Sequence, residues 1–450
     1  MLAVCRATRT QLLKAAGLPL REDQLIVEHG STSGLLIQVP PALRDESPPR
    51  PTREYSDVLV TGATGFIGAH LLHLLLTRTT ASVHCLVRER DGRSAADRLR
   101  EAYAWYLPGE RLERYAGRLA VLAADLSEPD FGLSREAYDR LGRTVDAIYH
   151  SAGDPRLFGD REFFERHNTR AVRALARFAM RGCPKDLHHV STLAVCGSGP
   201  DGESAVFSEG SLNIGQRFLN EYERSKYEAE CVVHEFVAQG GTGFIYRAGN
   251  VSGHSVTGRF QRNGGDNWLV QLVRACVLIG RVPRVFAETI PLSPVDIVAE
   301  GILAISRCAR LAGGTFHVDT GFAVEYQEIF AAVRETGYVL KVDDAPSFAA
   351  LLEAHLDEGD ERISLAHFWA SRPERNVRYD HSRTQRLLAE LGVEFPSLDR
   401  DWLDRYIGGL VRQGVISPEG KGQDGTCPMG ASVSSPGLRP ASGGRSPVTS

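Results

Sequence analysis

The stretch Val58-Leu59-Val60-Thr61-Gly62-Ala63-Thr64-Gly65-Phe66-Ile67-Gly68 decides the fold of this 450-residue chain. Three apolar residues indicate a short buried strand, and an apolar helical run begins after the last glycine. Gly62 permits the tight turn, Gly65 lets the backbone approach a phosphate, and Gly68 lets helix and strand pack closely. Such a loop can lay backbone N–H groups against a pyrophosphate at the helix N-terminus, so we predict a dinucleotide site here. The other cofactor-binding residues predicted in this loop are Thr64, Phe66 and Ile67.

Beyond this loop, short Val, Ile and Leu runs alternate with helical patterns, which is typical of βαβ units around a parallel sheet. The expected strands are Val58–Val60, Val83–Val87, Leu119–Leu122, Ala147–Tyr149, Leu187–Val190 and Gly243–Tyr246. The expected helices between them include Gly65–Leu76, Ala95–Tyr106, Phe163–Met180 and Glu221–Val237. Because crossovers between parallel strands are right-handed, the simplest topology is a doubly wound α/β sheet of the Rossmann type.

After Tyr246 the alternation gives way to further helical patterns. These are Asn267–Leu278, Val295–Ser306, Gln327–Glu335, Ser347–Leu356, Ser382–Leu391 and Leu398–Val411. We therefore expect a smaller, mostly helical C-terminal portion over the cofactor cleft, which would bind the substrate.

Composition divides the chain into segments. Residues 40–55 are rich in proline and charge, which predicts a linker. From Ser417 the sequence turns to Gly, Ser and Pro, which predicts a disordered tail. The expected division is an N-terminal extension and linker over 1–55, a dinucleotide-binding Rossmann domain over 56–260, a substrate-binding portion over 261–416 that is partly interleaved with it, and a tail over 417–450.

The overall composition is that of an ordinary globular protein. A formal net charge of −4 gives no electrostatic case for nucleic acid or an anionic membrane as partner. No apolar stretch reaches the roughly 18 residues that span a bilayer, and the N-terminus lacks the apolar core of a signal peptide. The eight cysteines occur singly, which argues against a zinc site and a disulfide framework. These observations predict a cytoplasmic protein without a metal site.

Three polar residues follow the glycine loop at informative positions. Tyr222 and Lys226 lie four residues apart on an expected helix and therefore share one face of it. A nearby ammonium favours phenolate, so we expect Lys226 to move the pKa of Tyr222 towards neutrality. Thr192 ends an expected strand and adds a hydroxyl that can hold a substrate oxygen. Together with the glycine loop, Thr192, Tyr222 and Lys226 predict reduction by a nicotinamide cofactor.

The end of the second strand predicts which nicotinamide cofactor is used. A carboxylate there would bind the ribose hydroxyls of NAD and repel the 2′-phosphate of NADP. This chain has Arg88 at that position, and a guanidinium suits a phosphate. We therefore predict NADPH, with Arg88 and Arg98 as its ligands, and place Arg90 and Arg93 on a solvated helix face.

Supporting cofactor contacts are expected after the third and fourth strands. Asp125 and Leu126 begin a loop that can touch adenine, and the small residues Ser151-Ala152-Gly153 let the backbone come close to the cofactor. Asn168 begins the next helix, either as an internal polar bridge or as a surface residue. Packing or surface roles are favoured over ligand roles for His150, His188 and His189.

These residues resemble the extended short-chain dehydrogenase/reductase superfamily, in which Thr, Tyr and Lys form the catalytic set. The likeness is greater to the thioester reductase family, which comprises terminal reductase domains of nonribosomal peptide synthetases, carboxylic acid reductases and α-aminoadipate reductase, with fatty acyl-CoA reductases as relatives. The segments that carry it, besides a long charged insertion after Arg88, are Asp125–Pro129, Phe131–Ser134, Ile148–Gly153, Tyr246–Gly253 and Ile290–Asp296. The likeness covers residues 57–310 well and continues loosely to about residue 414.

This resemblance implies an NADPH-dependent reductase that releases an acyl or peptidyl thioester as an aldehyde. The donor would be a carrier protein or coenzyme A, and a second reduction to the alcohol stays open, as does the oligomeric state. The same catalytic set also fits an epimerase, dehydratase or reductase acting on a sugar nucleotide or on a hydroxysteroid or flavanol-type carbonyl. A non-enzymatic redox sensor is the third alternative.

The chain departs from the family pattern at several positions. Ser151 and Gly153 stand where the family usually has Asn and Ala, which puts the nicotinamide-side hydrogen bonds in doubt. Thr192 keeps its hydroxyl although the residues after it vary. The segment before the glycine loop is too short for a complete adenylation domain or a normal carrier domain. Residues Gly30–Leu36 faintly resemble a phosphopantetheine attachment sequence, but an ordinary small apolar element is favoured there.

Overall fold

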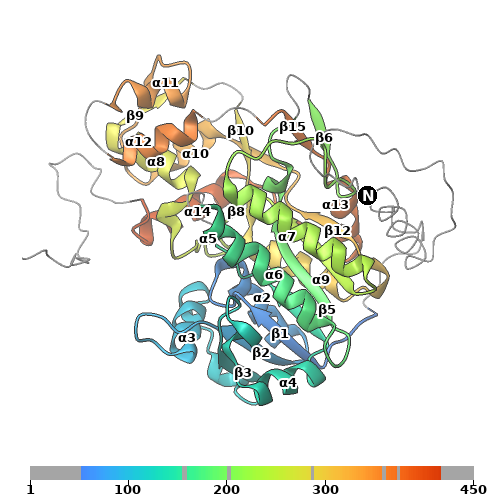
Figure 1. Cartoon of the computed structure of the whole chain (residues 1–450). Coiled ribbons are helices and arrows are strands. Elements are labelled where there is room, and N and C mark those ends of the chain that lie inside the picture. The colour runs from blue at the N-terminus through green and yellow to red at the C-terminus, as the bar shows by residue number, and fades with distance from the viewer. Residues whose placement is uncertain are drawn as a thin grey trace, which may run out of the picture.

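The computed structural model describes residues 52–154, 160–199, 204–284, 288–356, 361–371 and 375–416. Its centre is an all-parallel sheet of order β12-β7-β5-β4-β1-β2-β3 (Figure 1). The strands are β1 (Asp57–Thr61), β2 (Ser82–Val87), β3 (Leu119–Ala123), β4 (Ala147–His150), β5 (Asp186–Thr192), β7 (Thr242–Ala248) and β12 (Thr315–Val318). The chain winds outwards from β1 to β3 on one side and from β4 to β12 on the other. The direction of winding therefore changes between β1 and β4, where sheets of this type bind their ligands.

The doubly wound fold predicted from the sequence is confirmed, and so are its six strands to within two residues at each end. The edge strand β12 was not predicted. It has only four residues, Thr-Phe-His-Val, and lies among helical patterns, so its local signal is weak.

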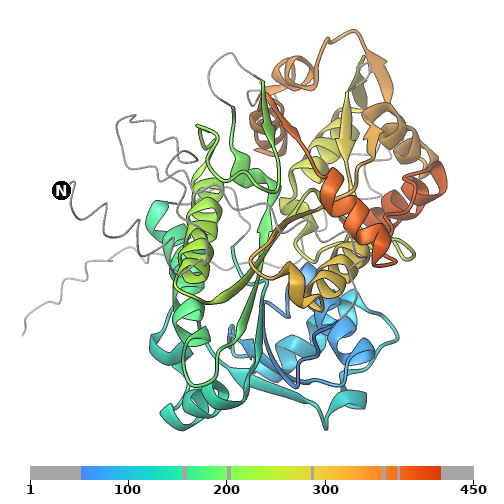
Figure 2. The same ribbon diagram turned by 90° about the vertical axis from the view of Figure 1, so that its right-hand side faces the viewer.

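Helices cover both faces of the sheet because alternate strand residues point to opposite sides. On one face, Tyr149 and Val190 pack with α2 (Phe66–Arg78), α3 (Ala95–Tyr106) and α9 (Val295–Ser306). On the other face, Ile148 and Leu187 pack with α4 (Arg135–Thr144), α6 (Arg170–Ala179) and α7 (Glu221–Ala238). Figure 2 shows α7 on one side of the sheet and α9 on the other.

The helix expected over Phe163–Met180 is interrupted by a wider turn. It consists of α5 (Arg161–Phe164), a π-helical turn η4 (Glu165–Thr169) and α6. A π turn inserts one extra residue into a helix and is frequent at functional sites. Here it contains Asn168, whose side chain is buried.

The C-terminal helices form a second core of their own. They are α8 (Trp268–Ile279), α10 (Tyr326–Glu335), α11 (Phe348–Glu353), α12 (Glu361–Ala370) and α14 (Arg400–Arg412) (Figure 1). The expected smaller helical portion is therefore confirmed, although α12, like α4 in the sheet domain, was not predicted. One further helix, α13 (Ser382–Glu390), packs through Leu388 onto the sheet domain.

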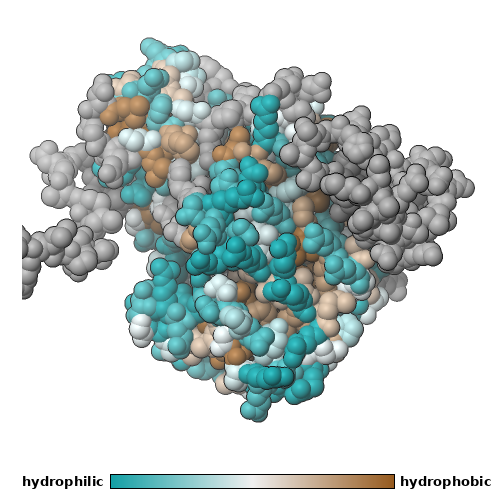
Figure 3. All heavy atoms as spheres, viewed as in Figure 1, coloured by the Kyte–Doolittle hydropathy of each residue, from teal (hydrophilic) through white to brown (hydrophobic). Residues whose placement is uncertain are grey.

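Four short strand pairs lie outside the main sheet in the part of the chain that the structure describes. They are β6 (Ala205–Phe207) with β15 (Val377–Tyr379), β8 (Val251–Ser252) with β11 (Ser293–Pro294), β9 (Arg281–Pro283) with β14 (Lys341–Asp343), and β10 (Thr289–Pro291) with β13 (Ala323–Glu325). Exposed apolar side chains occur on the helical portion, among them Leu278, Val342 and Phe368. Figure 3 shows brown, apolar surface over this region, whereas the face formed by α6 and α7 is mostly hydrophilic.

Several expectations concern residues that the structure does not describe. The tail over 417–450 and the segment Gly30–Leu36 lie wholly outside the described residues, and the linker over 40–55 lies there for the most part. Within the described ranges, no helix has both the length and the apolar character that crossing a membrane requires. Six of the eight cysteines are described, and their thiols are free.

Candidate active site

The glycine loop forms a close-packed cradle between β1 and α2. Gly62 has a φ of +78°, and a Cβ built on it would lie 2.4 Å from the backbone nitrogen of Ala152. A Cβ on Gly68 would lie 2.1 Å from the carbonyl oxygen of Gly62. The first N–H groups of α2 have no partner within the helix, and Gly65 has no side chain to cap them. This cradle fits a dinucleotide pyrophosphate, because it presents backbone donors and the positive end of a helix.

The loop after β4 packs directly against this cradle. The Ser151 hydroxyl donates to the Thr61 carbonyl at 2.9 Å, so it ties the loop after β4 to the end of β1. A Cβ on Gly153 would lie 3.1 Å from the Asn168 side-chain oxygen. Ser151 therefore takes a structural hydrogen bond, and Gly153 leaves room for Asn168, at the two positions that depart from the family pattern.

Asn168 is an internal bridge between the cofactor loop and α7. Its oxygen accepts from the backbone N–H of Asp154 at 2.9 Å, and its amide donates to the Ser225 hydroxyl at 2.9 Å. Ser225 in turn donates to the carbonyl of Tyr222 at 2.8 Å. With only 2% of its surface exposed, Asn168 is an internal residue, one of the two alternatives the sequence left open. The role of Ser225 was not predicted, although its position between Tyr222 and Lys226 was an available signal.

Thr192, Tyr222 and Lys226 come together at the carboxyl end of β5. Thr192 is the last residue of that strand. Its hydroxyl accepts from the Ala194 N–H at 3.2 Å and lies near enough to the Tyr222 phenol to lower the pKa of that group. Tyr222 lies in the first turn of α7, which begins after the capping side chain of Asn220. The Lys226 ammonium is buried and donates to the carbonyl of Val190 at 2.9 Å. The three side chains therefore share one site next to the loop after β4.

The expectation that Lys226 lowers the pKa of Tyr222 is wrong in this structure. Burial raises the pKa of the Tyr222 phenol to about 12. The neighbouring Thr192 hydroxyl opposes this rise, and the charges of Glu223 and Asp154 add to it. Burial also lowers the pKa of Lys226 to about 8, against the opposing charge of Glu230. The Lys226 ammonium points to the backbone carbonyl of Val190. The spacing of residues in the sequence cannot reveal in which direction this side chain points. At neutral pH the phenol is therefore protonated, the form that donates a proton.

A basic cluster lies at the end of β2. Arg88 follows this strand directly and is exposed, and Arg98 on α3 donates to the Arg88 carbonyl. The pKa of Arg98 is lowered by partial burial and then by the charges of Arg88 and Arg90. No described carboxylate lies within ion-pair distance of Arg88, whereas Arg93 pairs with Glu101 at 2.6 Å. Arg88 and Arg98 therefore leave positive charge available at the position where the adenosine ribose is expected.

The remaining predicted positions surround this edge of the sheet. Asp125 follows β3, and its carboxylate accepts from the N–H and the hydroxyl of Ser127 at 2.9 and 2.8 Å. Leu126 packs partly buried against the core of the α4 and α6 face. His150, His188 and His189 are all buried within the sheet. Among the described residues, no cluster of His, Cys, Asp and Glu side chains is arranged to hold a metal ion.

A buried ion pair lies near Thr192 and Lys226 and was not predicted. The Arg247 guanidinium of β7 contacts the Glu230 carboxylate of α7 at 2.7 Å, and both side chains are 0% exposed. Glu230 also accepts from the Ser191 hydroxyl at 2.5 Å. Ser191 precedes Thr192, and Glu230 lies one turn after Lys226. This network therefore joins the end of β5, which carries Thr192, to α7, which carries Tyr222 and Lys226.

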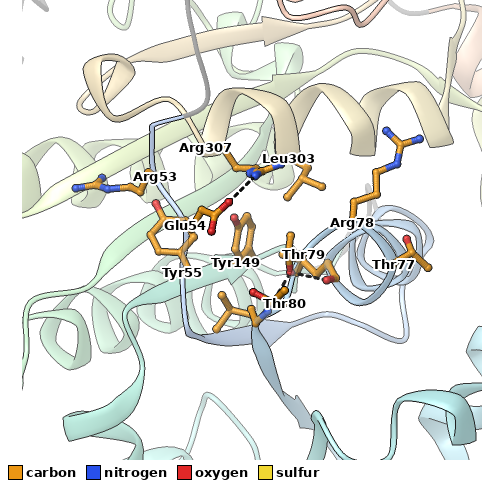
Figure 4. A pocket seen from close by; sticks show the side chains of 13 residues that line it. Arg53, Glu54, Tyr55, Thr77, Arg78, Thr79, Thr80, Tyr149, Leu303 and Arg307 are labelled. Carbon is orange, nitrogen blue, oxygen red and sulfur yellow. Dashed lines mark hydrogen bonds and ion pairs between the residues drawn. The ribbon is translucent and has the colours of Figure 1, made fainter.

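A separate cavity of about 320 Å³ lies at the opposite, amino-terminal edge of the sheet. Tyr55, Thr79 and Tyr149 contribute to its lining (Figure 4). Arg307 also lines it and pairs with Glu54 at 3.2 Å, as the figure shows. The cavity lies beyond the amino end of β1 and the carboxyl end of α2. It is therefore distinct from the glycine cradle, which lies at the other end of both elements.

Comparison with known proteins agrees with this geometry. The model of an NAD-binding family described as "Male sterility protein" matches residues 60–302. The chain therefore belongs to this family and is an NAD(P)-binding oxidoreductase of the extended short-chain dehydrogenase/reductase type.

Solved structures show which members of this superfamily the chain resembles in its fold. The terminal R domain from the myxalamid PKS-NRPS biosynthetic pathway is 30% identical, with a TM-score of 0.72, over 83% of this chain and 94% of that one. The reductase domain of a nonribosomal peptide synthetase from Mycobacterium tuberculosis is 26% identical, with a TM-score of 0.67, over 82% and 94%. The chain thus has the fold of a terminal reductase domain of a nonribosomal peptide synthetase.

A curated relative of this kind is one of the subunits of linear gramicidin synthase from Brevibacillus parabrevis. It is 29% identical to this chain over 409 residues, which cover 87% of this chain and 8% of the relative. The chain therefore spans only a small part of the length of this relative.

Proposed function

We propose that this chain reduces an acyl or peptidyl thioester with NADPH and releases an aldehyde and a free thiol. The observation that carries the proposal is the Thr192–Tyr222 hydroxyl pair at the carboxyl end of β5, next to the glycine cradle. Linear gramicidin synthase and a terminal R domain of a PKS-NRPS pathway are among the proteins it resembles. Both names support a carrier-bound thioester as the substrate. A coenzyme A thioester is the alternative substrate.

Each side chain of the site would have a separate role in the reaction. A bound reduced dinucleotide would supply the hydride to the thioester carbonyl carbon. The Thr192 and Tyr222 hydroxyls would hold the oxygen on which negative charge develops, and preorganised donors of this kind stabilise such a transition state. The protonated Tyr222 would supply the proton, which gives a hemithioacetal. This intermediate breaks its C–S bond to give the aldehyde and the thiol, so one hydride and one proton balance the reaction.

Other residues would hold the reactants in place. Asn168 and Ser225 fix the backbone of Tyr222 relative to the cofactor loop. Lys226 would hold the cofactor ribose. We assign the substrate side to the portion after residue 260, and a second reduction to the alcohol would use the same site. Six described free thiols favour a reducing cytoplasm as the place of action.

The test is the oxidation of NADPH by the purified chain with acyl-coenzyme A, acyl-pantetheine and acyl-carrier substrates. We expect loss of reduced-cofactor absorbance that depends on the thioester, with an aldehyde or alcohol identified by mass spectrometry. The matching oxygen ester is the control and should react far more slowly. If the folded chain binds NADPH but oxidises it only with a sugar nucleotide or a steroid-type carbonyl, the thioester proposal is wrong.

The basic cluster gives a prediction about cofactor preference. Arg88→Ala is expected to raise the Km for NADPH about 10- to 100-fold, which corresponds to losing a charge-assisted contact worth about 1.5–3 kcal/mol. The Km for NADH should change little, since NADH lacks the 2′-phosphate. Steady-state kinetics with both cofactors measure this difference. Arg93→Ala is the matched control, because its guanidinium is paired with Glu101; an equal effect of both variants would contradict the assignment.

A further inference from the structure

Arg375 reaches from the C-terminal portion into the neighbourhood of the catalytic residues. One guanidinium nitrogen contacts the Glu223 carboxylate at 2.7 Å, and another donates to the Gly197 carbonyl at 3.2 Å. The Arg375 carbonyl accepts from the Gly199 N–H at 2.7 Å. The side chain of Arg375 is 30% exposed and that of Glu223 only 1%. One residue far along the sequence thus joins two segments of the site.

The first of these segments follows Thr192. The short helical turn Leu193–Cys196 comes after the threonine and leads to Gly197. Residues 375–379, which we call the strap, lie along it. Within the strap, β15 pairs with β6, and the Tyr379 hydroxyl lies 3.5 Å from the Cys196 sulfur. The strap therefore holds the backbone that emerges from the catalytic threonine.

The second segment is the first turn of α7. Glu223 is the neighbour of Tyr222, and its backbone N–H donates to the capping side chain of Asn220 at 2.9 Å. Its carboxylate also accepts from the N–H of Leu219 at 2.9 Å. This reciprocal arrangement is a variant of the capping box, which fixes the start of a helix. A buried carboxylate needs a cation as well, and Arg375 is the one bonded to it.

We propose that Arg375 is a positioning residue that sets the distance between the Thr192 and Tyr222 hydroxyls. It does so by pinning the segment after Thr192 to the first turn of α7, so the C-terminal portion completes the oxyanion site. The contacts of the Arg375 guanidinium are with Glu223 and Gly197, and it acts on the two catalytic side chains through them. The role in thioester reduction rests on the proposed function, whereas the positioning role applies to any carbonyl reduced at this site.

The test separates catalysis from cofactor binding. Arg375→Met is expected to lower kcat about 10-fold or more, with the Kd for NADPH unchanged within about 2-fold, because the glycine cradle lies on other elements. Arg375→Lys keeps the charge but loses the forked contact, so it should recover part of the lost kcat. Arg378→Met is the matched control, since Arg378 is exposed on the same strap and should keep full activity.

Together with Arg375→Met, the variants Glu223→Gln and Glu223→Gln/Arg375→Met form a double-mutant cycle. If the pair acts as a unit, the double variant should lose no more kcat than Arg375→Met alone. The double variant also leaves no unpaired buried charge, so it keeps the test valid if Arg375→Met folds poorly. Equal losses in Arg375→Met and Arg378→Met, strictly additive losses in the cycle, or a fall in NADPH affinity that matches the fall in kcat would overturn the proposal.

Each variant is assayed with a thioester and with a simple aldehyde. If the wild-type chain reduces the aldehyde but no thioester, the proposed function fails while the positioning role is still tested. A readout without turnover is the titration of a fluorotyrosine placed at position 222, followed by ¹⁹F NMR. The charged groups near it are Glu223, Asp154 and Lys226, with Arg375 behind Glu223. Arg375→Met should raise the pKa at this position and Glu223→Gln should lower it; no shift in either would contradict the proposal.

Discussion

Tyr222→Phe is expected to lower kcat for thioester reduction about 100- to 10,000-fold, the usual contribution of a positioned proton donor. The change removes one oxygen, which is proposed both to donate the proton and to hold, with Thr192, the developing negative charge. Affinity for NADPH should stay within about 2-fold, because the glycine cradle and the basic cluster are untouched. Single-turnover kinetics and a cofactor titration measure the two effects separately.

Tyr227→Phe is the matched control for this prediction. Tyr227 lies on the same helix, one residue after Lys226, and its ring contacts Phe218. Loss of its hydroxyl should leave kcat nearly unchanged. If Tyr222→Phe retained wild-type turnover, or if both variants lost activity equally, the assignment of Tyr222 as proton donor would be wrong.

Arg247→Met is expected to lower the free energy of unfolding by about 3–5 kcal/mol, the usual cost of removing one partner from a buried ion pair. Both side chains of the Arg247–Glu230 pair are 0% exposed, so water cannot replace the lost guanidinium. The Glu230 carboxylate would lose its guanidinium partner and retain the hydrogen bond from Ser191. Urea unfolding should show a lower midpoint with an unchanged slope.

The double variant Glu230→Gln/Arg247→Met tests the cause of that loss. It removes both charges, so it should be more stable than Arg247→Met alone. Arg100→Met is a surface control, because Arg100 and its partner Asp97 are each about half exposed; its unfolding midpoint should match that of the wild type. An Arg247→Met midpoint equal to that of the wild type would show that the buried pair contributes little.

Much of the fold and site could be predicted because their signals are local. The glycine loop after an apolar run identifies β1 and α2, and the Tyr222–Lys226 spacing places both residues on one helix. The edge strand β12 was missed because a four-residue strand has too little periodicity to stand out. The tyrosine pKa was predicted wrongly because spacing fixes the face of a helix but not the direction of the Lys226 ammonium.

The supporting contacts could not be predicted for a different reason. Glu223 and Arg375 are joined by folding alone, and so are Glu230 and Arg247. No spacing rule links residues so far apart in the chain. A buried glutamate within a helix looks like any surface glutamate in the sequence, so its partner becomes visible only in three dimensions.

The strap over 375–379 has a consequence for the smallest working version of this enzyme. The family match ends at residue 302, which suggests a convenient place to cut the chain or to join it to another protein. A fragment ending there would retain Thr192, Tyr222 and Lys226 but lack Arg375 and β15. Hybrid enzymes built from this chain should therefore take the strap and α7 from the same parent.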